Sequence, residues 1–273
     1  MNDAELYQSS NALQKRDACQ CLEEFAATIK WKNSGDRIID IGCGDGSVTT
    51  NILKKYLPHN YKEIVGCDIS EEMVRFANEK HSNFDTKFIV LDIEGKLPEA
   101  LRRSFDHAVS FYTLHWIKHQ ESAFSNIYDL LSEGGDCLLM FIGHMPVYDV
   151  YRLLARTKRW RYWLKDVDRY VSPYHDSQEP EKEIKRMMEK IGFTNVDVKS
   201  KHSSYVYDSI EAVKKAVKAV NPFKIPKEMY HIFMEDYVNI LRDMRFIEPV
   251  NNNTDGSVHV RFSYSLLVVS AKK

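Results

Sequence analysis

The amino-acid sequence predicts an α/β fold built around a doubly wound, mostly parallel sheet. Three observations lead to this prediction: an apolar strand-like run over 38–41, glycines at alternating positions directly after it, and apolar residues at helical spacing beyond the glycines. An apolar run of this kind is typical of a parallel strand that is buried on both faces. The helical spacing then indicates a strand-to-helix crossover, whose apolar positions are Val48, Ile52, Leu53 and Tyr56.

The glycine loop after this strand indicates a binding site for a nucleotide-type cofactor. Its glycines are Gly42, Gly44 and Gly46, and the strand before them carries Asp40. Glycine lets a ligand approach the backbone closely, and doubly wound sheets bind ligands at the carboxyl ends of their strands. The G-x-G-x-G spacing differs from the G-x-G-x-x-G fingerprint of dinucleotide sites. A tight strand-to-helix turn without a ligand is the alternative interpretation.

The next two predicted strands also end in an acid. The run over 62–68 ends at Asp68 and is followed by a helix start at Ser70, and the run over 87–93 carries Asp92 near its end. Asp68 follows the glycine loop by about the 20 residues expected of an acid that binds ribose hydroxyls. A carboxylate suits this role because it can accept from two hydroxyls at once. Three such acids in series favour a cofactor site over separate turn caps.

Two more strands complete the first half of the predicted sheet. The run over 105–111 leads into a short segment of aromatic and polar residues over 112–116. A helix is predicted over about 121–131, and Gly134 is expected to close it with a left-handed cap. The apolar run over 137–142 is the fifth predicted strand, and it is far too short to span a membrane.

The second half of the chain alternates helical covers with strands. Aromatic residues crowd the segment over 143–176, which predicts an inserted helical cover rather than more sheet. Strand residues return over 193–199, and helices are predicted over 210–220 and about 227–244. The last strand, over 258–269, first alternates polar and apolar residues and then becomes fully apolar, as a strand at the centre of a sheet should.

These elements predict a single domain over 1–273. Its sheet core is expected over about 34–143 and 192–273, and the polar residues over 251–256 suit a connecting loop. The expected helical covers are the N-terminal segment 1–33 and two substrate covers over about 144–191 and 205–250.

The composition argues against several classes of function. The formal net charge of the 273 residues is -1, whereas nucleic-acid-binding surfaces need a basic excess. We interpret a local basic cluster at Arg156, Lys158, Arg159 and Arg161 as a solvated helix face. The first residues lack the basic and apolar regions of a signal peptide, which predicts a cytoplasmic location with reduced cysteines. Because Cys19 and Cys21 lack the spacing of a zinc element, no metal site is expected.

The cofactor motifs resemble those of the class I S-adenosylmethionine-dependent methyltransferases, whose first motif has the pattern acid-x-G-x-G-x-G. The resemblance implies a Rossmann-like fold: a seven-stranded, mostly parallel sheet with an antiparallel last strand and helical cover insertions. It implies S-adenosyl-L-methionine as the cofactor and S-adenosyl-L-homocysteine as the product. Asp40 would lie near the methionine portion, Asp68 at the ribose and Asp92 at the adenine amino group. The cofactor-binding residues that the resemblance implies are Asp40, Gly42, Cys43, Gly44, Asp68, Ile69, Asp92, Ile93 and Phe111.

Polar side chains near the N-terminus and an aromatic pair after the fourth strand narrow the resemblance. These residues are Tyr7, Asn11, Gln14, Asp17, His115 and Trp116. With them the whole chain is similar to the insect juvenile hormone acid O-methyltransferases. This resemblance implies methylation of farnesoic acid or juvenile hormone acid, apolar sesquiterpenoids with one carboxylate, to give juvenile hormone or its precursor. It places Gln14, His115 and Trp116 at the reaction centre and Tyr151 beside the substrate. An aromatic, methionine-containing cover suits such a substrate.

Methyl transfer to a carboxylate needs no general base. A carboxylic acid with a pKa of about 4 to 5 is already ionised at neutral pH, so the protein must align carboxylate, methyl group and sulfur and exclude water. The amide of Gln14 and the indole N–H of Trp116 are neutral donors that suit one carboxylate oxygen while the other attacks. His115 is interpreted as an orienting residue rather than an acid-base catalyst.

Two other functions remain open from the sequence. A methyltransferase acting on a hydroxyl or on a different acid would need a base, for which His115 is the candidate. A non-catalytic cofactor-binding protein would instead use its covers to bind a partner chain. The series of Asp40, Asp68 and Asp92 argues against loss of the cofactor. The preferred acid and the oligomeric state are left open.

Overall fold

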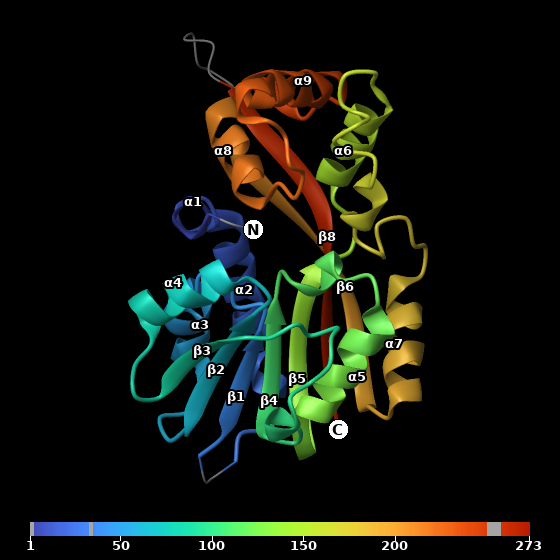
Figure 1. Cartoon of the computed structure of the whole chain (residues 1–273). Coiled ribbons are helices and arrows are strands. Elements are labelled where there is room, and N and C mark those ends of the chain that lie inside the picture. Colours follow the sequence, from blue (N-terminus) through green and yellow to red (C-terminus); the bar gives the residue numbers. More distant parts are fainter. Residues whose placement is uncertain (1–2, 33–34, 250–257) are drawn as a thin grey trace.

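The computed structural model describes residues 3–32, 35–249 and 258–273, so the expected connecting loop over 251–256 lies outside the described residues. Figure 1 shows a sheet with helices on both faces and a further group of helices beyond one end of the sheet. The strands are β1 Arg37–Ile41, β2 Glu63–Asp68, β3 Thr86–Val90, β4 Phe105–Phe111, β5 Leu131–Ile142, β6 Thr194–Tyr207, β7 Ile247–Pro249 and β8 Val258–Lys272. The α-helices are α1 Ala4–Gln8, α2 Ala12–Phe25, α3 Ser47–Asn51, α4 Glu71–His81, α5 Gln120–Leu130, α6 Pro146–Arg156, α7 Pro180–Ile191, α8 Ile210–Val220 and α9 Tyr230–Asp243. Short 3-10 helices are η1 Ala26–Thr28, η2 Leu53–Tyr56, η3 Glu99–Leu101, η4 Leu114–Trp116, η5 Val167–Arg169 and η6 Lys227–Met229.

The sheet has the strand order β3-β2-β1-β4-β5-β8-β6, and the short β7 pairs with β8. The strands from β3 to β5 pair in parallel, whereas β8 runs antiparallel to both β5 and β6. The chain order reverses between β1 and β4, so the carboxyl ends of these strands flank the crevice where such sheets bind ligands. The predicted mostly parallel sheet with an antiparallel last strand is confirmed, and β7 adds one strand to the expected seven.

Alternate residues of β1 show how both faces of the sheet are covered. Ile38 packs in a cluster with residues of α2, whereas Ile39 and Ile41 pack in a second cluster with residues of α5 and α7. Figure 1 shows α2, α3 and α4 on one side of the sheet and α5 and α7 on the other. Because neither face is open to water, the strand is apolar from Ile38 to Ile41 apart from Asp40, whose burial is therefore a specific feature of the site.

Helices α6, α8 and α9, which we call the cap, lie beyond the carboxyl ends of the parallel strands (Figure 1). Helix α6 packs against α9, and α8 packs against α1, β8 and β6. The aromatic residues of the expected cover anchor this region: Trp160 is fully buried, contacts the ring of Phe233, and donates from its indole nitrogen to Asp236 at 2.7 Å. The cap thus has an apolar core of its own that is continuous with one face of the sheet.

Three predicted elements differ from the structure. The helix predicted over 121–131 is confirmed as α5, but Gly134 does not cap it, because α5 ends at Leu130 with Leu131 already extended. Gly134 has a positive φ of 76° within β5, near the register shift between β4 and β5. Strand β6 runs to Tyr207 rather than stopping at Lys199, because its polar second half pairs with β8.

The third difference concerns α7, which forms the end of the segment expected to cover the substrate. It packs on β6 and α5, so it belongs to the helices on the α5 face of the sheet rather than to the cap. Its buried residues, Ile184 and Met188, join the same cluster as the apolar residues of α5. The helix predicted over 210–220 is confirmed as α8, and that over 227–244 is confirmed as η6 followed by α9.

Candidate active site

The glycine loop between β1 and α3 is held against the end of β2. The backbone N–H groups of Gly42 and Cys43 both donate to the carbonyl oxygen of Cys67, at 2.7 and 2.9 Å. Gly42 has a φ of 73°, and a Cβ there would lie 1.9 Å from the Thr113 hydroxyl oxygen. A side chain at this position would therefore separate the loop from the end of β4, so glycine is required by both conformation and contact.

The acid at the end of β1 is buried beneath this loop. Asp40 is 2% exposed, and one of its carboxylate oxygens accepts from the Thr49 hydroxyl at 2.6 Å. The pKa of Asp40 is raised to about 7, mainly by burial; the Thr49 hydrogen bond opposes this rise, and the nearby charge of Asp68 contributes to it. A cation bound beside Asp40 would stabilise its ionised form.

The acids after β2 and β3 lie along one groove. Asp68 accepts from the backbone N–H groups of Gly44 and Ser70, at 3.0 and 2.9 Å, and burial raises the pKa of its carboxyl. Asp92 is exposed and accepts from the backbone N–H of Glu94 at 3.0 Å. The groove has a volume of about 340 Å³. The predicted cofactor residues that line it are Gly42, Gly44, Asp68, Ile69, Asp92, Ile93 and Phe111.

A small polar hollow adjoins the groove, and the remaining predicted cofactor residues, Asp40 and Cys43, line it. The Oδ1 atom of Asp45 accepts from Ser47, but the Oδ2 atom of Asp45 and the Oε1 atom of Gln14 are buried without a hydrogen-bond partner among the described residues. Oxygen acceptors left unpaired in this way fit a ligand that brings donors. The cationic amino-acid end of S-adenosyl-L-methionine has this chemistry.

The groove itself suits the other end of such a cofactor. Ile69 is 68% exposed although it is a large apolar residue, and it lines the groove together with Ile93. Covering exposed apolar surface with a flat ring is favourable, and Asp68 offers carboxylate oxygens to sugar hydroxyls beside it. The groove and the hollow therefore fit the cofactor that the sequence predicts, although the role of each residue stays a prediction.

The end of β4 is locked to α2 by a buried carboxylate. Asp17 is 1% exposed and accepts from the hydroxyl groups of Tyr112 and Tyr264, and from Arg16. Tyr112 has a positive φ of 61°, which is rare for a bulky residue. Sequence reasoning included Asp17 only through the family resemblance and missed Tyr112 and Tyr264 as its partners. Nothing in their local sequence signals a contact between segments so far apart.

The short helix after β4 presents His115 and Trp116. The side chain of Gln120 braces this turn, since its amide nitrogen donates to the carbonyl oxygens of Leu114 and Ile117, both at 2.7 Å. The Nδ1 atom of His115 accepts from the backbone N–H of Ile142 at 3.4 Å, which leaves the proton on Nε2. Burial lowers the pKa of His115 to about 3, so its imidazole is neutral at physiological pH.

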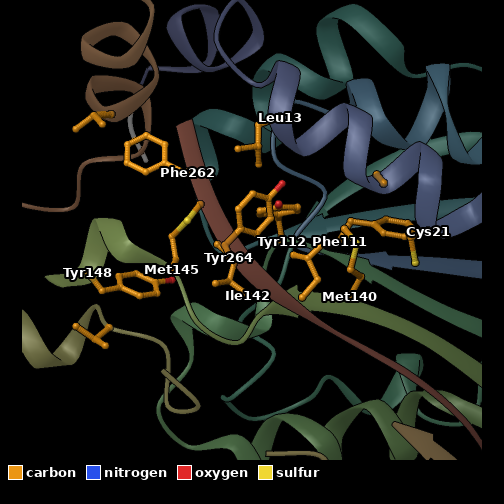
Figure 2. Packing of buried hydrophobic residues seen from close by; sticks show 14 of the residues in the cluster. Leu13, Cys21, Phe111, Tyr112, Met140, Ile142, Met145, Tyr148, Phe262 and Tyr264 are labelled. Carbon is orange, nitrogen blue, oxygen red and sulfur yellow. The ribbon is translucent and has the colours of Figure 1, made fainter. Parts of the chain in front are cut away.

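An apolar pocket lies between these residues and the cap helices α6 and α8. Gln14, His115, Trp116 and Tyr151, the predicted reaction and substrate residues, all line it. Figure 2 shows part of the surrounding core, with Ile142, Met145 and Tyr148 grouped close to Phe262 and Tyr112. The α8 residues of the pocket are Val213, Ala216, Val217 and Val220.

The apolar pocket and the cofactor groove share a boundary. Tyr7, Tyr112 and Trp116 line both of them, and Gln14 lines both the apolar pocket and the polar hollow. A group bound in the apolar pocket with its polar end at this boundary would therefore meet a cofactor in the groove. Tyr7, which only the family resemblance places at the site, lines all three cavities, because α1 folds back over the glycine loop.

The described residues contain no group of three or more His, Cys, Asp or Glu side chains arranged to hold a metal ion, so the expected lack of a metal stays a prediction. None of the helices in the described ranges has both the length and the apolar character needed to cross a bilayer.

Comparison with known proteins relates this chain to methyltransferases. A family model for a methyltransferase domain matches residues 12–198. The chain is 56% identical over 273 residues to the juvenile hormone acid O-methyltransferase of Bombyx mori, covering 100% of this chain and 98% of that protein. It is 38% identical over 279 residues to the juvenile hormone acid O-methyltransferase of Drosophila melanogaster, covering 100% and 93%.

Solved structures resemble the chain in fold. The YcgJ protein from Bacillus subtilis matches with a TM-score of 0.60 and 18% identity, over 93% of this chain and 98% of that one. Phosphoethanolamine N-methyltransferase 2 of Haemonchus contortus, solved with S-adenosyl-L-methionine, matches with a TM-score of 0.51 and 17% identity, over 94% of this chain and 52% of that one. These likenesses confirm the predicted fold class.

We predict that His115 lowers the stability of the folded protein in mild acid. The unfolded chain takes up a proton at this side chain below about pH 6.5, whereas the folded protein does not until the pH approaches about 3. The free energy of unfolding is therefore expected to fall as the pH drops below about 6.5, since the unfolded state binds more protons. Urea denaturation at about pH 8 and about pH 5 measures this fall.

The His115→Asn variant should show a smaller fall between the two pH values, whereas His119→Asn, a change at an exposed histidine nearby, should behave as wild type. An equal fall in wild type and in His115→Asn would contradict the buried, neutral state of this imidazole.

Proposed function

We propose, from the premise that this chain belongs to the methyltransferase domain family and is a homologue of the juvenile hormone acid O-methyltransferases, that it methylates the carboxylate of a sesquiterpenoid acid. Farnesoic acid and juvenile hormone acid are the proposed substrates, and the products are the methyl ester and S-adenosyl-L-homocysteine. The observation that carries the proposal is the junction of an acid-lined groove with an apolar pocket at Trp116.

The proposed cofactor residues divide between the two ends of the ligand. When bound, S-adenosyl-L-methionine supplies an electrophilic methyl group. Asp68 would accept from the ribose hydroxyls, and Ile69 and Ile93 would pack against the adenine ring. Asp40 and Asp45 face the polar hollow, where their carboxylates would hold the amino group. The raised pKa of Asp40, about 7, supports this placement, because a cationic partner would compensate for its burial.

The proposed substrate lies with its hydrocarbon chain beneath the cap and its carboxylate at the boundary. The walls of the pocket are apolar and aromatic, and no lysine or arginine lines it among the described residues. The amide nitrogen of Gln14 and the indole N–H of Trp116 would donate to one carboxylate oxygen and leave the other free to attack. Neutral donors orient the anion without stabilising it as strongly as a cationic side chain would, which favours its reactivity.

The environment of His115 supports methylation of an acid over methylation of a hydroxyl. A hydroxyl acceptor would need a base whose pKa lies near the working pH. His115, the candidate base, has a pKa of about 3 and already accepts a backbone hydrogen bond through Nδ1. A carboxylate needs no base because it is ionised above about pH 5. We therefore assign His115 an orienting role, in contact with the rings of Tyr112 and Trp116.

We also propose a cytoplasmic location and a small-molecule partner. All five cysteines are free thiols in the structure, which supports the proposal of a reducing, cytoplasmic location. The proposed partner is a small apolar acid rather than a nucleic acid, because the net charge of -1 provides no basic excess.

The proposed activity is tested by methyl transfer to matched acceptors. Purified protein with S-adenosyl-L-methionine should convert farnesoic acid to its methyl ester, and should leave the corresponding alcohol, farnesol, unmethylated. Product is measured by mass spectrometry after the reaction. Methylation of farnesol at a rate comparable to that of the acid would favour the alternative, a hydroxyl methyltransferase, and binding of the cofactor without turnover of either compound would favour a non-catalytic protein.

We predict that Asp68→Ala weakens cofactor binding more than tenfold. Two ribose hydroxyls would lose a charged acceptor, and hydrogen bonds to charged groups contribute about 1.5 to 3 kcal/mol each. Isothermal titration calorimetry with S-adenosyl-L-homocysteine measures the change. Glu71→Ala, which removes an exposed carboxylate in the first turn of α4, is the control and should bind normally. Unchanged affinity in Asp68→Ala would remove Asp68 from the proposed site.

We predict that Gln14→Ala and Trp116→Phe each lower kcat/KM for farnesoic acid about tenfold or more, the factor expected for a lost hydrogen bond of about 1.4 kcal/mol. Cofactor affinity should change less than kcat/KM, because the amide nitrogen of Gln14 and the indole N–H of Trp116 are proposed to bind the substrate carboxylate, whereas only the Oε1 atom of Gln14 is left for the cofactor in the polar hollow. Gln20→Ala, an exposed glutamine on the same helix α2, is the matched control for Gln14. A parallel loss of cofactor affinity would instead assign these residues to the architecture of the groove.

A further inference from the structure

The segment that follows α6 is rich in basic and aromatic residues. Five of the ten residues over 156–165 are lysine or arginine, and none is acidic. The sequence predicts a solvated helix face here, but α6 ends at Arg156 and the chain continues in turns. These turns belong to the cap, because the buried Trp160 packs on the ring of Phe233 in α9. Figure 1 shows α6 and α9 together beyond the end of the sheet.

Helical hydrogen bonds in these turns separate a buried side from an exposed side. The backbone N–H groups of residues 161 and 164 donate to the carbonyl oxygens four positions earlier, both at 3.1 Å. Trp160 and Leu164, four positions apart, are fully buried on the inner side. Four exposed residues have the spacing i, i+3, i+4 and i+7, so they share another side of the turns. We call them the basic face: Lys158, Arg161, Tyr162 and Lys165.

The charge of the basic face is not neutralised within the molecule. Arg159, which lies in the same turns, pairs with Asp236 at 2.9 Å, whereas the three cations of the basic face form no ion pair among the described residues. Asp166 is the one acid directly beside them in the chain, so the face stays positive. Such a patch attracts a polyanionic surface although the chain has a net charge of -1, because this attraction acts only within about 10 Å.

The aromatic residues of the segment favour a lipid surface as the anionic partner. Tyr162 is 74% exposed, and its ring lies edge-on to the partly exposed ring of Trp163, at 5.5 Å between centroids. Tyrosine and tryptophan suit the boundary between a bilayer and water, because each has an apolar ring with one polar group. Lysine and arginine beside them can lay their apolar stems along lipid and keep the charge among the headgroups. Cations mixed with exposed rings therefore fit an anionic bilayer surface.

We propose that the basic face is a peripheral membrane-binding surface, whose three cations bind anionic lipid headgroups while the ring of Tyr162 inserts among them. Helix α6 leads from the apolar pocket, which Tyr148 and Tyr151 line, to this face. A cap bound in this way would hold the pocket close to the phase in which apolar acids dissolve. That consequence rests on the proposed function, whereas the binding of the basic face to a bilayer does not.

Co-sedimentation of the full chain with lipid vesicles tests the proposal. The probes are vesicles of phosphatidylcholine alone and mixed vesicles of phosphatidylcholine and phosphatidylserine. Wild type should bind the mixed vesicles about tenfold or more tightly than the neutral ones, and should lose this preference as salt is raised. The triple variant with Lys158→Gln, Arg161→Gln and Lys165→Gln should bind the mixed vesicles about tenfold or more weakly than wild type. Tyr162→Ala should weaken binding by a smaller factor that persists at high salt.

The matched control removes the same three charges from exposed positions of α7, which packs outside the cap, and should bind as wild type: Lys182→Gln, Lys185→Gln and Arg186→Gln. Equal binding of wild type to both kinds of vesicle, no binding to either, or equal weakening in the two triple variants would overturn the proposal.

Immobilised heparin, a polyanion without hydrocarbon, separates a lipid surface from other anionic partners. Wild type that binds heparin but not the mixed vesicles would also overturn the proposal and assign the basic face to a different anion. The vesicle assays contain neither acid substrate nor cofactor. Their outcome is therefore independent of whether the protein methylates farnesoic acid, and a failure of one proposal leaves the other standing.

Discussion

The buried carboxylate of Asp17 is the interaction on which the active-site architecture depends. It binds the hydroxyls of Tyr112 and Tyr264 and the guanidinium of Arg16, and so joins α2, the end of β4 and β8 at one point. A buried carboxylate is costly unless its oxygens are satisfied, which makes this arrangement of the three segments strongly preferred over alternatives. Because Tyr112 is held with a positive φ, the chain turns directly after β4 and carries Trp116 toward the groove.

The same arrangement brings two chemically different cavities into contact. The groove and its hollow contain Asp40, Asp45 and Asp68, whereas the pocket beneath the cap is apolar and aromatic. Each kind of lining suits one reactant, and transfer between reactants is rapid only when they are held at contact distance in a fixed orientation. Helices α1 and α2 carry Tyr7 and Gln14 over the junction, so the N-terminal segment shapes the place where the two reactants would meet.

The electrostatics of the junction are consistent with a reaction that needs alignment rather than proton transfer. Burial keeps the His115 imidazole neutral, with a pKa of about 3, and leaves Asp40 with a pKa of about 7. The first effect removes a base from the substrate side, and the second leaves a carboxylate that gains from a cationic partner on the cofactor side. Burial, rather than local sequence, thus lowers the pKa of His115 and raises the pKa of Asp40.

The sequence by itself determined the parallel sheet, the glycine loop and the three acids at the strand ends, because each depends on a short run of residues. Alternating glycines permit the positive φ values of the loop, and apolar runs predict strands buried on both faces. Since the carboxyl ends of parallel strands meet at one edge, Asp40, Asp68 and Asp92 could be placed around one crevice before the structure was known.

Only the tertiary structure decided which residues complete the site. Gly134 lies in β5 instead of capping α5, and β6 continues as far as Tyr207. Helix α7 packs against α5 and β6 instead of joining the cap. In each case strand pairing or helix packing with distant segments overrides the local spacing. The pairing of Asp17 with Tyr112 and Tyr264 could not be read from the chain. Hydrogen bonding and burial are properties of neighbours in space, and these neighbours lie far apart in sequence.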